Sequence, residues 1–193
     1  MIELNSTTKT SRRVFWMRRL LFLVLVFGLF GGAVFLLARE KTPPVLAVHF
    51  SPGGKPTEAI VEALNQAKQA VLVQAYSFTS APIAEALVKA NRRGAHVQVI
   101  LDSSQETTNK YSPADFLAHA KIHCYIDREH AIAHNKVMII DGQTVITGSF
   151  NFTKAAEEKN AENLLVIQDA ALAKEYAKNW RVHQMHSEQY KGR

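Results

Sequence analysis

The stretch from Ala131 to Thr153 limits what this chain can fold into more than any other segment. It reads AIAHNKVMIIDGQTVITGSFNFT, with the pair Asp141-Gly142 between two runs rich in apolar and β-branched residues. Asp-Gly between such runs is the strongest short-range signal for a β-hairpin. The sequence therefore predicts two antiparallel strands joined by a two-residue turn.

The predicted hairpin has a defined register. Counted outward from the turn, the expected pairs are Ile140 with Gln143, Lys136 with Thr147, and His134 with Ser149. Because side chains alternate between faces and opposed residues share one, His134, Lys136 and Ser149 are expected on one face. Asn151, two residues further on, follows on that side. An imidazole, an ammonium, a hydroxyl and an amide on one face suit an oxyanion such as phosphate.

Asp141 is expected to lie apart from this cluster. Seven residues of strand span roughly 23 Å, which places His134 and Asp141 at opposite ends of the first strand. We expect Asp141 to hold the turn through local backbone hydrogen bonds rather than to contact a substrate.

The polar and glycine residues of this stretch have a characteristic spacing: His134-x-Lys136-x4-Asp141, then Gly148-Ser149-x-Asn151-x-Thr153. The constellation resembles the signature of the phospholipase D superfamily. It is most similar to the small single-motif branch, the bacterial periplasmic endonucleases of the Nuc type. The similarity extends from about Val45 to the C-terminus, and includes the segments 49–52, 75–79 and 153–163.

The resemblance implies a phosphodiesterase that uses two histidines and no metal. One histidine attacks phosphorus to form a phosphohistidine, and the second protonates the leaving oxygen. Because the chain has one motif, the second histidine implies a homodimer with two hairpins facing across a twofold axis. Lys136, Ser149 and Asn151 would stabilise the developing charge, and Glu162 would hydrogen-bond a catalytic histidine, that of the partner.

Apolar strands alternate with helical segments after Val45. The expected strands are residues 45–50, 71–75, 97–101, 122–126, the hairpin and 163–167, and the expected helices are 57–69, 81–92, 113–119 and 170–186. This alternation predicts an α/β fold with a mixed, largely parallel β-sheet and helices on both faces. Strand ends such as Tyr76 and Asp102 are expected to border the site. The resemblance implies the phospholipase D/nuclease fold.

The N-terminal part carries most of the net charge of +6, because residues 1–41 hold seven Lys or Arg and two Glu. The rest is nearly neutral, so bulk charge argues neither for nor against a nucleic-acid substrate. The single cysteine, Cys124, excludes an intrachain disulfide and a Cys-based metal site, and its apolar neighbours predict that it is buried.

An uncharged apolar run from Leu20 to Leu37 is long enough to span a membrane. Basic residues precede it, so the positive-inside rule places the N-terminus in the cytoplasm and the rest outside. We therefore expect a basic cytoplasmic tail (1–19), a transmembrane anchor or uncleaved signal (20–38), a linker (39–44) and a phospholipase D-like catalytic domain (45–193). This places the domain on the periplasmic side of the inner membrane. The alternative is secretion to the periplasm after cleavage, although the best cleavage site lies well past the apolar run.

Other histidines have no recognisable role in the sequence. His49 either lines the cleft or packs, and the remaining ones lack ligand-like spacing: His96, His119, His123, His130, His183 and His186. We therefore expect no metal and no other cofactor.

The predicted function is that of a membrane-tethered, nonspecific endonuclease whose substrate is DNA, RNA or both. The alternative is a membrane-anchored phospholipase D or cardiolipin hydrolase, since the same chemistry cleaves phospholipid. A catalytically silent nucleic-acid-binding module is the third reading, and the intact motif argues against it.

Overall fold

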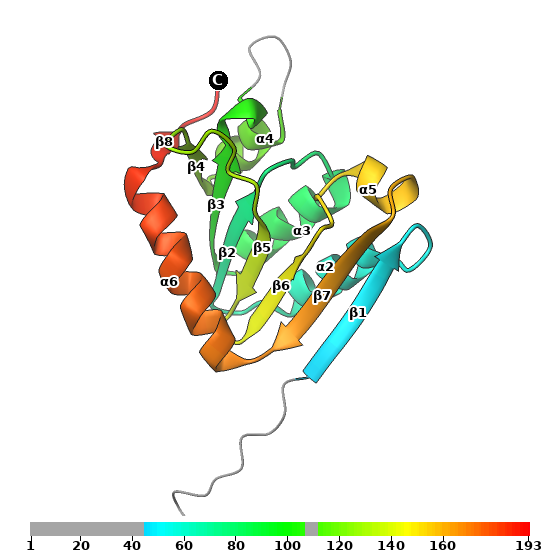
Figure 1. The fold of residues 1–193 in the computed structure, drawn as a ribbon. Helices are drawn as coiled ribbons and strands as arrows, with labels where there is room; N and C mark the ends of the chain where they lie inside the picture. Colours follow the sequence, from blue (N-terminus) through cyan, green and yellow to red (C-terminus); the bar gives the residue numbers. More distant parts are fainter. Residues whose placement is uncertain (1–44, 107–111) are drawn as a thin grey trace, which may run out of the picture. The chain divides into compact units, whose positions relative to one another are not determined.

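An eight-stranded sheet organises the part of the chain that the structure, a computed structural model, describes: residues 45–106 and 112–193 (Figure 1). The strand order is β1-β7-β6-β5-β2-β3-β4-β8. The strands are β1 Val45–Ser51, β2 Ala70–Ala75, β3 His96–Asp102, β4 His123–Asp127, β5 Lys136–Ile140, β6 Thr144–Gly148, β7 Glu162–Gln168 and β8 Glu188–Tyr190. The helices are α2 Pro56–Gln66, α3 Ala81–Arg92, α4 Pro113–His119, α5 Lys154–Glu158 and α6 Ala170–His186, with a 3-10 turn η1 at Ser103–Gln105.

The sheet is mixed, as predicted, but the prediction that it is largely parallel is wrong. Among the described strands, only the β2–β3 and β3–β4 pairs are parallel, and the other five pairs are antiparallel. The parallel pairs are those whose crossovers contain α3 and α4. β5, β6 and β7 follow one another antiparallel, and β1 joins this half of the sheet at its edge rather than pairing with β2.

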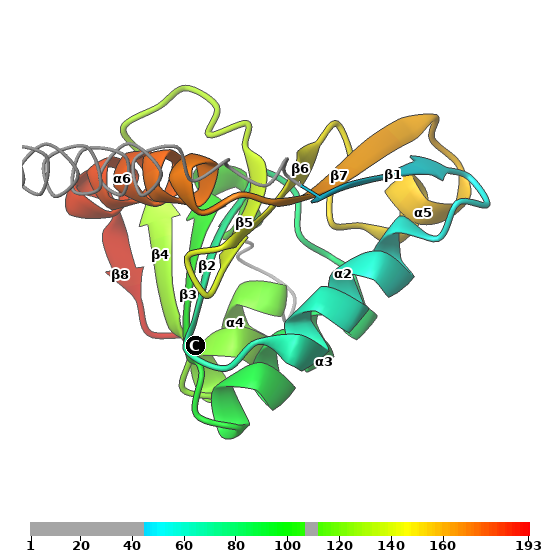
Figure 2. The ribbon, with the colours of Figure 1, turned by 90° about the horizontal axis from the view of Figure 1, so that it is seen from below.

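Helices cover both faces of the sheet, which confirms that part of the prediction. Figure 2 shows α2, α3 and α4 below the sheet and α6 above it. Val99 and Leu101 of β3 pack on the lower side, whereas Ile100 belongs to a second core with Trp180 of α6. The indole N–H of Trp180 donates to the backbone oxygen of Val73 (2.8 Å), so the buried ring leaves no polar atom unpaired. Strands covered on two faces explain the continuous apolar runs in the sequence.

Three helices have the predicted bounds, because their end signals are local. α3 ends before Gly94, whose φ of +100° allows the chain to leave the helix. α4 begins with a capping box formed by Ser112 and Asp115, and α6 begins at the cap Asp169, which accepts two backbone hydrogen bonds. Cys124 is fully buried, as predicted, and burial raises the pKa of its thiol to about 12.

α2 is shorter than predicted. It begins at Pro56 rather than after a Thr57 cap, and it ends at Gln66 rather than Gln69. The backbone N–H groups of Lys68, Gln69 and Ala70 donate to the carboxylate of Asp141 at 2.9, 2.8 and 3.0 Å. Because these donors are taken by a distant side chain, the helix cannot continue through them.

The hairpin forms at Asp141-Gly142, but its ladder is shifted by one residue from the prediction. Gln143 N–H donates to Ile140 O (3.0 Å) as in a tight turn, yet Ile140 pairs with Thr144. The carbonyl of Gln143 accepts instead from the N–H of Asp169, just past β7. This contact with the cap residue of α6 holds Gln143 outside the hairpin ladder, so the loop has three residues.

The predicted membrane anchor, residues 20–38, and the other N-terminal segments, 1–19 and 39–44, lie outside the described residues. Within residues 45–106 and 112–193, no helix has both the length and the apolar character that a membrane span requires.

Candidate active site

His134 and Lys136 lie where the chain enters β5, next to the end of β2. The His134 ring is exposed and its centroid is 4.6 Å from that of Tyr76, which follows β2. The ammonium of Lys136 donates to the carbonyl of His134 (2.9 Å) and lies 5.1 Å from the centre of the Tyr76 ring. Tyr76 N–H donates to the carbonyl of Asn135 (2.8 Å). The backbone at His134 and Asn135 is thus held next to the end of β2, while the imidazole of His134 remains exposed to solvent.

Asp102, at the end of β3, fixes the loop that leads to His134. Its buried carboxylate accepts from the N–H of Ala133 (2.7 Å) and from the N–H of Ser104 (2.9 Å). Burial raises the pKa of this carboxyl, but the hydrogen bonds from Ser104 and Ala133 outweigh it and the net shift is downward. Tyr76 and Asp102, two strand-end residues, therefore both border His134.

Ser149 lies beside Glu162 rather than opposite His134, the position that the two-residue turn predicted. The one-residue shift removes that pairing, and His134 itself precedes β5. The hydroxyl of Ser149 donates to Glu162 (2.6 Å) and accepts from the backbone N–H of Asn163 (3.1 Å). The other oxygen of Glu162 accepts from the side chain of Asn160 (3.0 Å). The Ser149 hydroxyl is therefore oriented by β7, not by β5.

An electrostatic interaction connects Lys136, which lies beside His134 in the chain entering β5, with Glu162, which binds Ser149. Lys136 is almost fully buried at 6% exposure, and this burial lowers the pKa of its ammonium, while the charge of Glu162 acts in the opposite direction. A partly desolvated ammonium interacts more strongly with an arriving anion than one in bulk water. His134, Lys136, Ser149 and Glu162 therefore form one polar site along the ends of β2, β5, β6 and β7.

Asn151 adds an uncommitted amide. Its Oδ1 atom is buried and accepts no hydrogen bond from the described residues. A buried acceptor without a partner costs stability, so such atoms usually meet a ligand, a water or another chain.

Asp141 lies away from this site, at the other end of β5. Its carboxylate holds the segment from Lys68 to Ala70, which lies about 70 residues away in the chain, rather than only its own turn. Burial raises the pKa of the carboxyl, but the bonds from Ala70, Gln69 and Lys68 together outweigh it, so the pKa is lowered. The side chain of Asp141 therefore binds backbone N–H groups of residues 68–70 and is not part of the site around His134.

Asp141→Asn should destabilise the protein by about 2–3 kcal/mol at pH 7, because the amide cannot accept all three backbone N–H groups. Since the carboxyl pKa is lowered on folding, its stabilising effect is full above the unfolded value of about 3.9 and is lost as the pH falls from there through the lower folded pKa. Urea unfolding at several pH values should show the stability difference between wild type and variant shrinking as the pH falls below about 4. Glu58→Gln, at an exposed pair with Lys55, should change stability by less than about 0.5 kcal/mol throughout. An equal loss at pH 3 and pH 7 would contradict the carboxylate explanation.

A groove of about 1180 Å³ lies elsewhere, between α2, β1 and the end of β7. His49 and Asp141 line it, but His134, Lys136, Ser149, Asn151 and Glu162 do not. The ring of His49 lies 3.1 Å from the carbonyl of Gly54 within this region. This groove is therefore separate from the candidate site.

The structure corrects the expectation that the remaining histidines are unrelated. His130, His183 and His186 converge on the buried carboxylate of Asp127. Two of them are three residues apart on α6, a spacing that places both on one face of a helix. That pair was the available sequence signal, but Asp127 and His130 join it only through the packing of α6 on β4.

Comparison with known proteins identifies the family. The family described as "Cardiolipin synthase, PLD-like domain" matches residues 60–183. A protein of Rickettsia conorii named phospholipase D is 44% identical over 144 residues, which cover 75% of this chain and 70% of that protein. This chain belongs to the phospholipase D superfamily. The resemblance read from the motif is therefore confirmed, and so, at the level of the family, is the prediction of a phosphodiester hydrolase.

Other similar proteins have names that differ from phospholipase D. A mitochondrial cardiolipin hydrolase of Xenopus laevis is 32% identical over 107 residues, or 54% of this chain and half of that protein. The structure of Nuc from Salmonella typhimurium, a phospholipase D family member, is 35% identical and superposes with a TM-score of 0.72 over 77% of this chain and 99% of Nuc. NucT from Helicobacter pylori, at 24% identity and a TM-score of 0.71, shows the shared fold.

Proposed function

We propose that this protein hydrolyses phosphodiester bonds of nucleic acids, as a nonspecific endonuclease, with His134 as the nucleophile. The observation that carries the proposal is an exposed imidazole, that of His134, and an almost buried ammonium, that of Lys136, which both lie near the ring of Tyr76. A phosphodiester repels anionic nucleophiles, and a neutral imidazole avoids that repulsion. The ammonium then lies where negative charge develops on the phosphoryl oxygens.

In the proposed reaction, a nitrogen of His134 attacks phosphorus as the bond to the leaving oxygen breaks. A second histidine donates a proton to that oxygen. The resulting phosphohistidine is hydrolysed when the second histidine takes a proton from water, which attacks phosphorus and releases His134. Ser149 and Asn151 would bind phosphoryl oxygens, and Glu162, which already accepts from Ser149, would orient the histidine of a second copy.

We propose that the second histidine is His134 of another copy of this chain, in a homodimer. Leu46, Val48 and Phe50 alternate along the edge strand β1 and expose 57%, 45% and 63% of their surface on one side of the sheet. Such an apolar strip favours a protein interface. Phe50 pairs with Asn163, which contacts the Ser149 hydroxyl, so the strip is continuous with the candidate site. A twofold contact here would bury the strip and bring two half-sites together.

Phe50→Glu should weaken the homodimer about 100-fold, because a charge would be buried in an apolar contact. Analytical ultracentrifugation of the full-length protein in detergent measures the change, and phosphodiesterase activity should fall in parallel at low protein concentration. Lys89→Glu, on the exposed face of α3 across the sheet, is the control and should leave the dimer intact. A Phe50→Glu protein that stays dimeric with full turnover would exclude this strip as the interface.

A phospholipid substrate is the alternative. It is favoured by the names of the relatives from Rickettsia and Xenopus, whereas the nuclease proposal draws on the similarity to Nuc. The apolar strip of β1 would then contact lipid. In either case we propose that the N-terminal anchor holds the domain on the periplasmic side of the inner membrane.

One assay separates these functions. The full-length protein in detergent would be given plasmid DNA, RNA and cardiolipin vesicles, without added divalent cations. We expect nicking of DNA or cleavage of RNA that is lost in His134→Ala. Lipid turnover without cleavage of nucleic acid would support the alternative. Binding of nucleic acid without any turnover would overturn both, and so would activity that survives in His134→Ala.

A further inference from the structure

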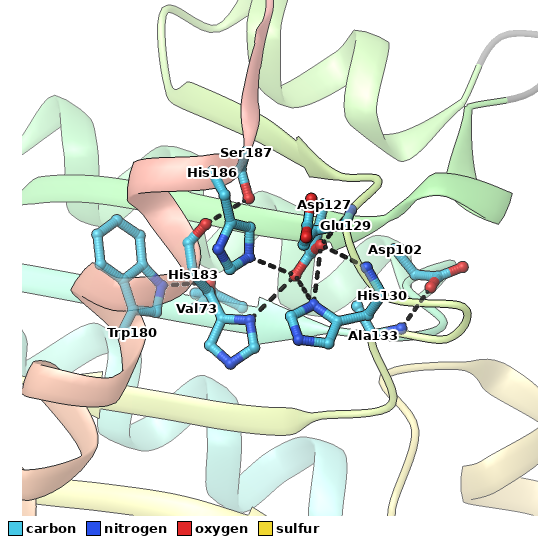
Figure 3. Close-up of polar contacts among 10 residues, drawn as sticks. All are labelled: Val73, Asp102, Asp127, Glu129, His130, Ala133, Trp180, His183, His186 and Ser187. Atoms are coloured by element: carbon cyan, nitrogen blue, oxygen red, sulfur yellow. Dashed lines mark hydrogen bonds and ion pairs between the residues drawn. The ribbon is translucent and has the colours of Figure 1, made fainter.

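Three imidazoles and one carboxylate meet at the junction of β4, the β4–β5 loop and the last turns of α6 (Figure 3). Asp127 ends β4 and its side chain is fully buried. His130 Nδ1, His183 Nδ1 and His186 Nε2 lie 3.1, 3.0 and 3.3 Å from Asp127 Oδ2. The proposed phosphodiesterase mechanism uses none of these four residues.

The geometry of the cluster matches that of four ligands around one metal ion. One ligand atom from each residue can be chosen so that all lie within 4.8 Å of one another. The ring centroids of His130, His183 and His186 are separated by 4.9, 5.2 and 5.2 Å, which is nearly an equilateral triangle. Imidazoles bound about 2.0–2.1 Å from a tetrahedral zinc ion have centroids about 5 Å apart and ligand atoms about 3.3 Å apart.

The carboxylate of Asp127 has few free acceptor positions for the three histidine rings around it. The other carboxylate oxygen, Oδ1, already has the backbone N–H groups of Glu129 and His130 at 3.1 and 3.4 Å. Three ring nitrogens lie within 3.3 Å of Oδ2, which has two lone pairs, and one of them, His130 Nδ1, lies 3.2 Å from Oδ1 as well. One cation bound by three neutral imidazoles and the carboxylate would replace these competing contacts. The backbone donors to Oδ1 would then hold the carboxylate in place, as the outer partners of metal ligands do.

We propose that Asp127, His130, His183 and His186 bind one divalent transition-metal ion of the zinc class. Three nitrogens and one oxygen are the donor set that zinc accepts, and four protein ligands make a closed, structural site. The side chain of His130 is 44% exposed and provides the route by which the ion enters. The ion would tie the end of α6 to the β4–β5 loop, the loop that carries His134 four residues after His130.

Neighbouring contacts also connect the end of α6 to the β4–β5 loop. Arg128 in the same loop pairs with Glu188 just after α6 (3.0 Å) and with Glu106. The hydroxyl of Ser187 donates to the carbonyl of His183 (2.7 Å), which orders the backbone where α6 ends. The cluster therefore lies within a set of contacts that already fix the loop to the helix.

The test measures metal binding directly and needs no phosphodiesterase activity, so it is independent of the proposed function. Full-length protein, purified in detergent without a polyhistidine tag, would be titrated with zinc against a chromophoric chelator. Its metal content would be measured by mass spectrometry. We expect one zinc ion per chain, and Co²⁺ in its place should give the intense visible absorption of a tetrahedral site. His183→Gln combined with His186→Gln should weaken zinc binding by roughly 100-fold or more.

The control is His96→Gln combined with His123→Gln, because these two exposed rings also lie close together, at 5.7 Å, but outside the cluster. This variant should bind zinc like the wild type. Since the double variant in α6 could fail to fold, His130→Gln in the exposed loop is measured as well and should also lose most of its affinity. Zinc should raise the thermal midpoint of the wild type but not of the cluster variants. A wild type that binds no zinc, or cluster variants that bind it as tightly, would overturn the proposal.

Discussion

Replacing His134 by Ala should lower phosphodiester hydrolysis by about 10⁴-fold or more, the largest effect on activity expected for any single substitution in this chain. The reason is that the proposed mechanism needs the imidazole both as nucleophile and, from the second copy, as proton donor. Because the side chain is exposed, the variant should keep most of its stability. Turnover of the substrate found in the assay above, together with thermal unfolding, measures both. His123→Ala, another exposed histidine, is the control and should keep full activity.

Mixing the two proteins tests whether the histidines are shared. If wild type and His134→Ala exchange subunits at equal amounts, a shared site should leave about one quarter of the activity of the same total protein as wild type. Independent sites would leave about one half. A linear decline of activity with the fraction of wild type would therefore contradict a catalytic centre made from two copies.

Gly148→Ala should destabilise the protein by about 3–4 kcal/mol, the largest loss of stability that we predict. Gly148 has φ of +147°, and a Cβ atom there would lie 2.3 Å from the backbone oxygen of Asn163. Relief of this clash requires β6 and β7 to separate where Ser149 meets Glu162. Urea unfolding measures the loss, which corresponds to roughly 10 °C in the thermal midpoint of a domain of this size.

Gly142→Ala is the matched control for the conformational part of this effect. Gly142 also has positive φ, +64°, but nothing lies within 4 Å of a Cβ atom at that position. Its substitution should cost only about 1 kcal/mol, the strain of a left-handed residue. If the two variants lose the same stability, the close approach of Asn163 to Gly148 is not what requires glycine there.

The motif predicted the residues of the candidate site but not their arrangement. The Asp-Gly signal correctly located the hairpin, yet the contact of Gln143 with Asp169 shifted the ladder by one residue. With that shift Ser149 no longer lies opposite His134, and its hydroxyl bonds Glu162 and Asn163 of β7 instead. Asp141 was expected to bond locally, and it bonds instead to Lys68, 73 residues earlier in the chain.

Local chemistry was sufficient for the helices α3, α4 and α6, whose caps, apolar spacing and terminal glycine lie within the segments themselves. The order and direction of the strands, the end of α2 and the gathering of three histidines around Asp127 depended on contacts between distant segments. Side-chain periodicity and turn residues act over a few positions, so they can be identified from the sequence alone. Which faces bury one another is settled only when the whole sheet has assembled, and that assembly placed His130 beside α6.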